Sequence, residues 1–203
     1  MTPIKTALAG AALLLSSTAA SATTIEITNG ELLDENETIV ENAAKVETFS
    51  TLVAAVQAAG LADALMGEGP FTVFAPLDSA FAELPEGTVE SLLMEENREQ
   101  LVTLLSAHVV PAKVTGRELQ IAFASTGDVV FSEDGGEVMS EEDGRVRLST
   151  LTLVSDLAID KRGDAFYIEA INGTGEEAEI VGTDIMASNG VIHVIDTVLT
   201  PNQ

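Results

Sequence analysis

The stretch from Gly69 to Pro85 constrains the fold more than any other part of the chain. Its first half, Phe71 to Ala75, is a short and almost wholly apolar run, which is typical of a strand covered on both faces. Pro76 ends that strand because it has no amide hydrogen to give to a neighbouring strand. Asp78 is expected to cap a short helix, its carboxylate accepting from amides two or three residues further on. A buried strand that turns directly into a helix needs apolar material on both sides, so the flanking segments must supply a core.

The chain begins with the pattern of a secretory signal peptide. One positive charge precedes an apolar block from Ala7 to Leu15 and small residues that end in Ala20-Ser21-Ala22. The block is too short to span a bilayer, and the A-x-A ending predicts cleavage after Ala22. We therefore expect an exported protein, periplasmic or extracellular, in which residues 1–22 are removed. Residues 23–37 would then form a polar lead-in and residues 38–201 a single domain.

Charge and cysteine content limit the partners and the means of stabilisation. The chain has no cysteine, which excludes disulfides and a lipid-modified N-terminal cysteine, so the domain must be held by its own core. After cleavage Lys5 is lost, and eight basic residues face 33 acidic ones, a net charge of −25. Such a charge repels nucleic acid and anionic membranes, and it leaves cations, basic proteins and neutral surfaces as favourable partners.

Hydrophobic periodicity divides the chain into a helical first half and a strand-rich second half. Before Gly116, apolar residues recur at helical spacing in Thr38 to Lys45, Phe49 to Val56 and Glu95 to Ala107. After Gly116, alternating β-branched residues predict strands at 129–131, 145–154, 157–160, 165–171, 178–186 and 191–199. Helices first and strands later indicate an α+β fold, not an alternating βαβ series.

The segment from Ser132 to Asp143 is too acidic to bury much surface and is expected to form a loop or hairpin inserted into the domain. Its spacing does not match an EF-hand loop, so a solvated run of charge is the simpler interpretation. Divalent cation binding at this segment is the functional alternative. Its acidic residues are Glu133, Asp134, Glu137, Glu141, Glu142 and Asp143.

Two segments together resemble the signature segments of the fasciclin domain family. The first is Thr72 to Phe81, TVFAPLDSAF, and the second is Ala187 to Leu199, ASNGVIHVIDTVL. Between them, Leu104 to Pro111 is similar to the family's Tyr-His segment, although Ala107 stands where the family usually has tyrosine. The helical segment from Phe49 to Gly60 also resembles the opening of the family's domain.

This resemblance covers roughly residues 38–201 and implies the family's fold, a β-wedge of two small sheets flanked by α-helices in the N-terminal half. It implies a secreted or surface-displayed adhesion and interaction module, not an enzyme, and no cofactor. In that family the histidine of the Tyr-His segment pairs with the aspartate of the first signature. The resemblance thus implies a pair of His108 with Asp78, and a structural position for His193 in the second signature.

Two catalytic or metal-binding alternatives are weak on chemical grounds. His108 and His193 are the only histidines, and no nearby spacing supplies the further ligands that a zinc site needs. A hydrolase could be assembled from Ser79, His108 and either Asp78 or Asp196. The chain has no G-x-S-x-G elbow to expose the serine and form an oxyanion hole, so a structural role for the histidines is favoured.

Arg162, Gly163 and Asp164 form an integrin-type tripeptide between two predicted strands. Gly163 supplies the positive φ that a hairpin turn favours, so the triplet has a sufficient structural explanation. An interaction loop at these residues is the functional alternative.

Together these features predict an exported fasciclin-like module that binds a protein or polysaccharide partner at the cell surface or in the periplasm. The alternative is an acidic periplasmic protein that binds cations or small ligands.

Overall fold

The computed structural model describes residues 34–125, 129–131, 137–141, 144–152, 155–171 and 173–201. The helices in these ranges are α1 (Ile39–Lys45), α2 (Ser50–Ala59), α3 (Ala62–Leu65), α4 (Asp78–Ala82), α5 (Thr88–Leu92), α6 (Arg98–Ala107) and α7 (Gly116–Ala124), with 3-10 turns at Glu47–Phe49 and Glu95–Asn97. The strands are β1 (Phe71–Pro76), β2 (Val109–Val110), β3 (Val129–Phe131), β4 (Glu137–Ser140), β5 (Val146–Leu148), β6 (Leu157–Arg162), β7 (Ala165–Ala170), β8 (Glu177–Ala187) and β9 (Gly190–Ile195).

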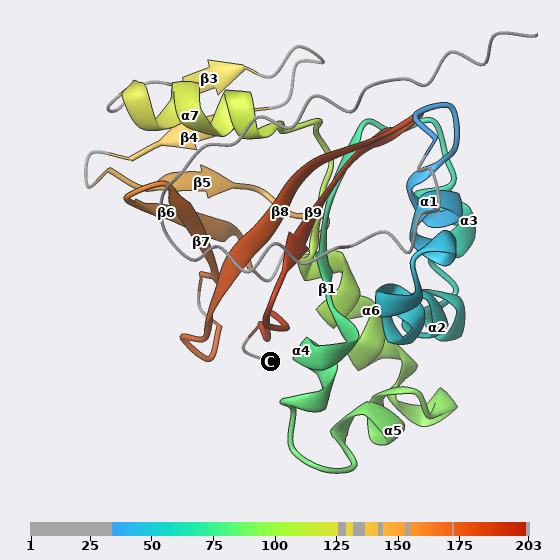
Figure 1. Ribbon diagram of the computed structural model, residues 1–203. Coiled ribbons are helices and arrows are strands. Elements are labelled where there is room, and N and C mark those ends of the chain that lie inside the picture. Colours follow the sequence, from blue (N-terminus) through green and yellow to red (C-terminus); the bar gives the residue numbers. More distant parts are fainter. Residues whose placement is uncertain are drawn as a thin grey trace, which may run out of the picture.

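The strands of the described residues join in one continuous order, β2-β1-β9-β8-β7-β6-β5-β4-β3. β1 and β9 run parallel, with Phe71 opposite Gly190 and Pro76 opposite Ile195, and the other neighbouring pairs are antiparallel. Helices α1–α6 lie beside one half of this mixed sheet and α7 beside the other (Figure 1). The arrangement agrees with the predicted α+β class, whereas a division into two small sheets is not confirmed.

Strand β8 belongs to both halves of the sheet. Its residues Glu177 to Glu179 pair with β7, and Ile180, Gly182 and Ile185 to Ala187 pair with β9. The β8–β9 register shifts on both sides of Gly182, and the neighbouring Asp184 has a φ of 63°. Such irregularities bend a strand and increase its twist. β8 therefore carries the chain from the strand-rich half to the half covered by the helices.

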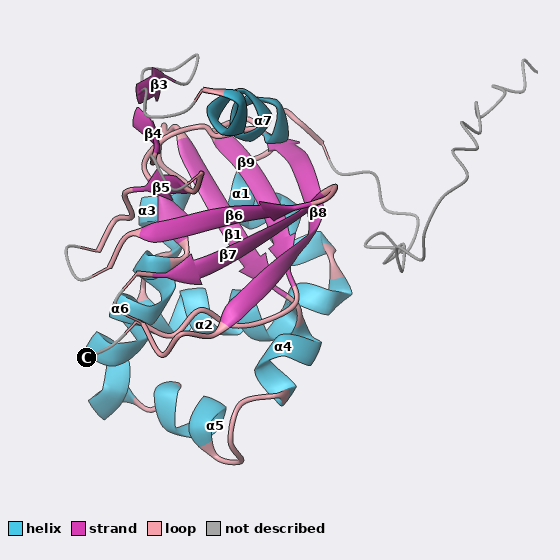
Figure 2. Cartoon of the chain, turned by 90° about the vertical axis from the view of Figure 1, so that its left-hand side faces the viewer, coloured by secondary structure: helices cyan, strands magenta, loops and turns pink. Residues whose placement is uncertain are grey.

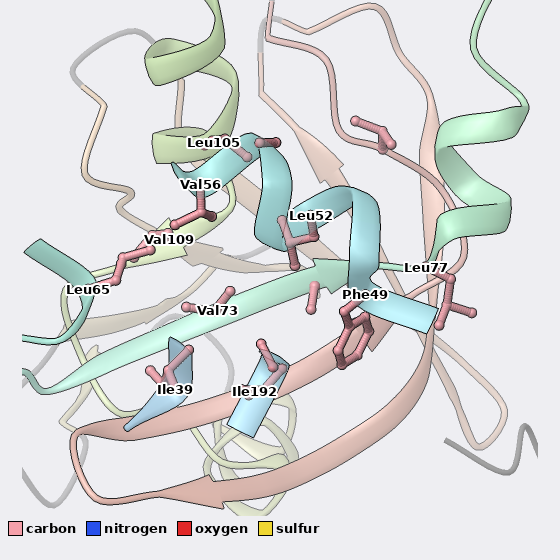
Figure 3. Close-up of a cluster of buried hydrophobic side chains, with 14 of the residues drawn as sticks. Ile39, Phe49, Leu52, Val56, Leu65, Val73, Leu77, Leu105, Val109 and Ile192 are labelled. Carbon is pink, nitrogen blue, oxygen red and sulfur yellow. The ribbon is translucent and has the colours of Figure 1, made fainter. Parts of the chain in front are cut away.

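One hydrophobic core lies between β1, β9 and helices α1–α6. Val73 of β1 and Ile192 of β9 contribute from the strands, because alternate residues of a strand point to the same face. Figure 3 shows these two side chains among residues from the helical side, which include Ile39, Phe49, Leu52 and Val56.

A second core lies on the opposite face of β1 and β9. Phe74 of β1 and Ile195 of β9 point into it, and α7 closes it with Leu119 and Ala122. The inner faces of β5, β6 and β7 complete it with Val146, Leu148, Leu157, Ile159, Phe166, Ile168 and Ala170. β1 is thus buried on both faces, which confirms the interpretation of its apolar sequence.

Helix α7 corrects the expectation that strand character begins directly after Gly116. Thr115 accepts a hydrogen bond from the amide of Glu118, and the Glu118 carboxylate accepts from the amide of Thr115 at 2.6 Å. This reciprocal capping box fixes the first turn of a helix. Leu119 and Ala122 then fall on one buried face, so tertiary packing and the cap together form the helix.

The predicted strands of the second half are present, with differences at their ends. Among residues 145–152 of the segment predicted at 145–154, only the short strand β5 forms, and Thr150 donates its hydroxyl to the carbonyl of Ser155 at 2.6 Å. Residues 153 and 154 of that prediction lie outside the described residues. The acidic segment contains strand β4, which pairs antiparallel with β3 and β5, so its described part agrees with the hairpin and not with the loop alternative. Residues 132–136, 142 and 143 of that segment lie outside the described residues, as do the predicted signal peptide and the lead-in up to residue 33.

The close approach of β1 and β9 predicts that Gly190→Ala is strongly destabilising. A Cβ atom at Gly190 would lie 1.9 Å from the backbone oxygen of Phe71, so the two strands would have to separate. We expect the free energy of unfolding, measured by urea denaturation, to fall by about 2–4 kcal/mol.

Gly87→Ala is the matched control for this substitution. Gly87 also has a positive φ, 83°, but a Cβ atom added there would meet nothing within 4 Å. Only backbone strain should remain at this position, about 1 kcal/mol. Equal losses in the two variants would show that close strand pairing is not the reason for glycine at residue 190.

Candidate functional site

The carboxylate of Asp78 caps a neighbouring helix, not its own. Asp78 is the first residue of α4, and its oxygens accept from the hydroxyl of Ser50 at 2.6 Å and the amide of Thr51 at 2.8 Å. Both donors lie in the first turn of α2, whose amides have no partners within the helix. The expected cap of the α4 amides is therefore wrong, and Asp78 instead ties the start of α4 to the start of α2.

His108 is buried, with 2% of its surface exposed, and both of its ring nitrogens contact the backbone. Nδ1 lies 2.8 Å from the carbonyl oxygen of Leu104, and Nε2 accepts from the amide of Leu199 at 3.0 Å. The pairing with Asp78 implied by the family resemblance is wrong for this chain. The Asp78 carboxylate is already occupied at α2, and His108 joins α6 to the segment after β9.

His193 has a similar environment on strand β9. It is fully buried and stacks on Phe74 with 5.5 Å between ring centroids. Nε2 lies 2.7 Å from the carbonyl oxygen of Val114, and Nδ1 accepts from the amide of Asp184 at 3.4 Å. His193 therefore links β9 both to the loop before α7 and to the bulge of β8.

These contacts fix the tautomer of each histidine. A carbonyl oxygen only accepts and an amide only donates, so each ring carries one proton, on Nδ1 in His108 and on Nε2 in His193. Burial lowers the pKa of His108 to about 4 and also lowers the pKa of His193. Both rings are neutral at pH 7 and hold no free lone pair for a metal or for proton transfer.

The candidate hydrolase triad of Ser79, His108 and Asp78 or Asp196 does not form in the structure. Ser79 is exposed on α4, whereas His108 is buried and fully hydrogen-bonded. The Asp196 carboxylate accepts from the amide of Glu179 and the hydroxyl of Thr197. Across the part of the chain that the structure describes, no cluster of three or more His, Cys, Asp or Glu side chains could hold a metal ion.

Asn189 is a structural residue whose role the sequence did not reveal beyond its place in a turn. Its side chain is 6% exposed and accepts from the amide of Ile39 at 3.0 Å. Its amide nitrogen donates to the carbonyls of Leu65 and Gly67 at 2.7 and 2.8 Å. One amide group thus joins α1, the end of α3 and the β8–β9 turn.

The Arg162-Gly163-Asp164 triplet forms the turn between β6 and β7, with Gly163 at φ 67°. The Arg162 side chain does not project from this turn. Its guanidinium lies 4.8 Å from the ring centroid of Tyr167 and donates to both carboxylate oxygens of Glu177, at 2.9 and 2.6 Å. These hydrogen bonds raise the pKa of Arg162 and lower the pKa of Glu177. Arg162 is exposed despite these contacts, as are Gly163 and Asp164.

The same sheet face carries two further arginine–carboxylate pairs. Arg145 donates to Glu169 at 2.9 Å, and Arg147 pairs with Glu141 at 2.6 Å. Three of the chain's five arginines, Arg145, Arg147 and Arg162, therefore gather on β5–β8, although the chain has a net charge of −24. The clustering of basic residues between 145 and 162 in an otherwise acidic sequence is the signal that could have pointed to this face.

No helix among the described residues is long and apolar enough to cross a membrane.

Comparison with known proteins identifies one domain family. A family model described as the fasciclin domain matches residues 47–201. The Synechocystis protein named Protein sll1483 is 45% identical over 168 residues, which cover 83% of this chain and 76% of that protein. The pig transforming growth factor-beta-induced protein ig-h3 is 35% identical over 155 residues, 75% of this chain but 18% of that protein.

A solved structure is similar in fold. It is described as a FAS1 domain pair from the insect cell adhesion molecule Fasciclin I, and it matches with a TM-score of 0.58 and 16% sequence identity. The match covers 80% of this chain and 50% of that chain. The similarity supports the architecture, and the low identity limits it to the fold.

The buried neutral state of His108 predicts a pH-dependent effect of His108→Ala. At pH 7 the variant leaves the amide of Leu199 unsatisfied, and we expect a loss of about 1–3 kcal/mol in urea unfolding. The folded pKa of about 4 lies below the ordinary value of 6.5, so wild-type His108 stabilises above pH 6.5. That contribution is lost as the pH falls from 6.5 through 4, and the gap between wild type and variant should shrink by up to about 1.4 kcal/mol per pH unit.

Leu105→Ala provides the matched control, because Leu105 is a buried neighbour on α6 with no titrating group. Its destabilisation should stay constant over the same range of pH. A gap for His108→Ala that is equally constant would mean that burial does not lower the pKa of His108 in the fold.

Proposed function

The chain belongs to the fasciclin domain family, and from that premise we propose that it is an exported, non-enzymatic interaction module. Its partner is a protein or polysaccharide at the cell surface or in the periplasm. The signal-peptide pattern of the first 22 residues supports export. Membership of a family whose resemblance implies adhesion and interaction modules supports an adhesive role.

The observation that carries this proposal is that the chemically capable side chains of the family segments are used inside the fold. His108 and His193 bond to backbone groups with both ring nitrogens, and Asp78 and Asn189 bond to helix ends. The two histidines and Asn189 are also buried, and a buried, hydrogen-bonded group cannot act on a substrate without breaking the fold. Asp78 is half-buried, and its carboxylate is held by Ser50 and Thr51. These residues hold a rigid domain together, which leaves recognition to exposed side chains.

The proposal predicts a loss of attachment in cells that lack the gene. A deletion strain should adhere less to polysaccharide- and protein-coated surfaces, and added mature domain, residues 23–203, should restore adhesion. An equally acidic protein of unrelated fold serves as the control, because the net charge alone could alter adhesion. Unchanged attachment on all coatings, or rescue by the control protein, would contradict the proposal.

A further inference from the structure

We propose that the outer face of strands β5–β8 binds a neutral polysaccharide, through Tyr167 and the arginine–carboxylate pairs around it. This inference rests on the proposed interaction function and deepens it by naming the surface and the class of partner. We call this surface the arginine face, defined by Arg145, Arg147, Ala158, Arg162, Tyr167 and Glu169.

The alternation of the strands separates the arginine face from the core. On β7, Phe166, Ile168 and Ala170 are buried, and the intervening Tyr167 and Glu169 point to the other side. On β6, Asp160 lies opposite Tyr167 and Ala158 lies opposite Glu169. On β5, Arg147 lies opposite Ala158. Figure 2 looks onto β6 and β7, and no helix lies in front of them.

The arginine face is hollowed instead of flat. One depression of about 340 Å³ lies between Arg145, Arg162 and Tyr167, and an adjoining one of about 210 Å³ lies beside Arg147. Both depressions are lined by Arg145, Ala158 and Glu169. Ala158 is only 2% exposed, so a small side chain forms the floor while long side chains form the rim. Their volumes are close to the lower end of the range for small-ligand sites, enough for a short stretch of a chain-like partner.

The polar groups of the arginine face are suited to hydroxyl groups. A sugar hydroxyl both donates and accepts a hydrogen bond, so it fits best beside a donor and an acceptor held close together. Arg145 with Glu169, and Arg162 with Glu177, present such adjacent donors and acceptors at 2.6–2.9 Å. Mutual pairing holds these side chains in place, which lowers the entropy cost of binding. Tyr167 adds apolar surface for the C–H groups of a sugar ring.

The charge of the protein favours a neutral polymer over a polyanion or a basic protein as the partner. A polyanion would be repelled by the net charge of −24 and by the carboxylates on the arginine face itself. A basic protein would be attracted by the rest of the molecule, but here each arginine is already paired with a carboxylate, so the arginine face offers it no excess of negative charge like that elsewhere. A neutral polysaccharide incurs no repulsion, and it is recognised by hydrogen bonds and not by net charge.

The ion pairs of this face are not needed to hold the fold, which makes the proposal testable. Exposed arginine–carboxylate pairs contribute little to stability because water and salt screen them. Removing one arginine, or truncating Tyr167, should therefore leave unfolding nearly unchanged. A face that serves only to keep the strands soluble would show no loss of ligand binding in such variants.

Affinity gel electrophoresis of the mature domain tests the proposal, using gels that contain dextran, laminarin, galactomannan or xylan, with alginate as the anionic arm. We expect retardation by at least one neutral polymer and none by alginate. Tyr167→Ala and Arg145→Gln should each weaken that retardation by about tenfold. Arg117→Gln, at an exposed arginine on α7, is the control and should bind as wild type does.

Urea unfolding of each variant shows whether the fold is intact. The inference is overturned if no neutral polymer retards the protein, if alginate is the sole ligand, or if Tyr167→Ala and Arg145→Gln bind as wild type does. The attachment assay separates this failure from that of the proposed function. A Tyr167→Ala, Arg145→Gln double variant that still restores adhesion would overturn the arginine face and leave the interaction module standing.

Discussion

The parallel pairing of β1 with β9 is the constraint on which the rest of the structure depends. The two strands come from ends of the domain more than 100 residues apart, yet Phe71 lies opposite Gly190 and each strand is buried on both faces. A two-sided strand pair requires a core on each side, and α1–α6 supply one while α7 and β5–β7 supply the other. Because a parallel pair cannot be closed by a short turn, a long segment must connect β1 to β9. That segment supplies α4–α7 and β2–β8, whereas α1–α3 enter the first core from the chain before β1.

The buried polar groups follow from this arrangement. Ends of helices and loops that meet the central strands leave backbone donors and acceptors without water, and each must find a partner. His108, His193, Asn189 and Asp78 supply those partners, each joining segments far apart in the sequence. Two imidazoles are well suited to this task because a neutral ring offers one donor and one acceptor in fixed directions. Because both ring nitrogens of each histidine are hydrogen-bonded, neither ring can bind a metal or transfer a proton.

The sequence predicted the elements better than their contacts. An apolar run ended by proline was sufficient for β1, and alternation was sufficient for β6, β7 and β9, because these patterns report local geometry and burial. Helix α7 was missed although its capping residues, Thr115 and Glu118, stood in the sequence at the right spacing. The partner of His108 could not be derived, because the choice between a carboxylate and a backbone amide depends on how α2, α4 and the last residues meet in space. The arginine face is a property of register across strands β5–β8, which no single segment reveals.

The residues that identify the domain and those proposed to bind its partner are thus separate sets, and physical chemistry explains why. A residue such as Gly190 or Asn189 satisfies several contacts at once, so a substitution there affects the whole fold. The outer positions of β5–β8 contact solvent on one side and contribute little to stability, so they can change without loss of the core. A fold stabilised in this way can present different binding faces on the same scaffold. The family segments then determine the fold, whereas the exposed side chains of the outer strands determine which partner binds.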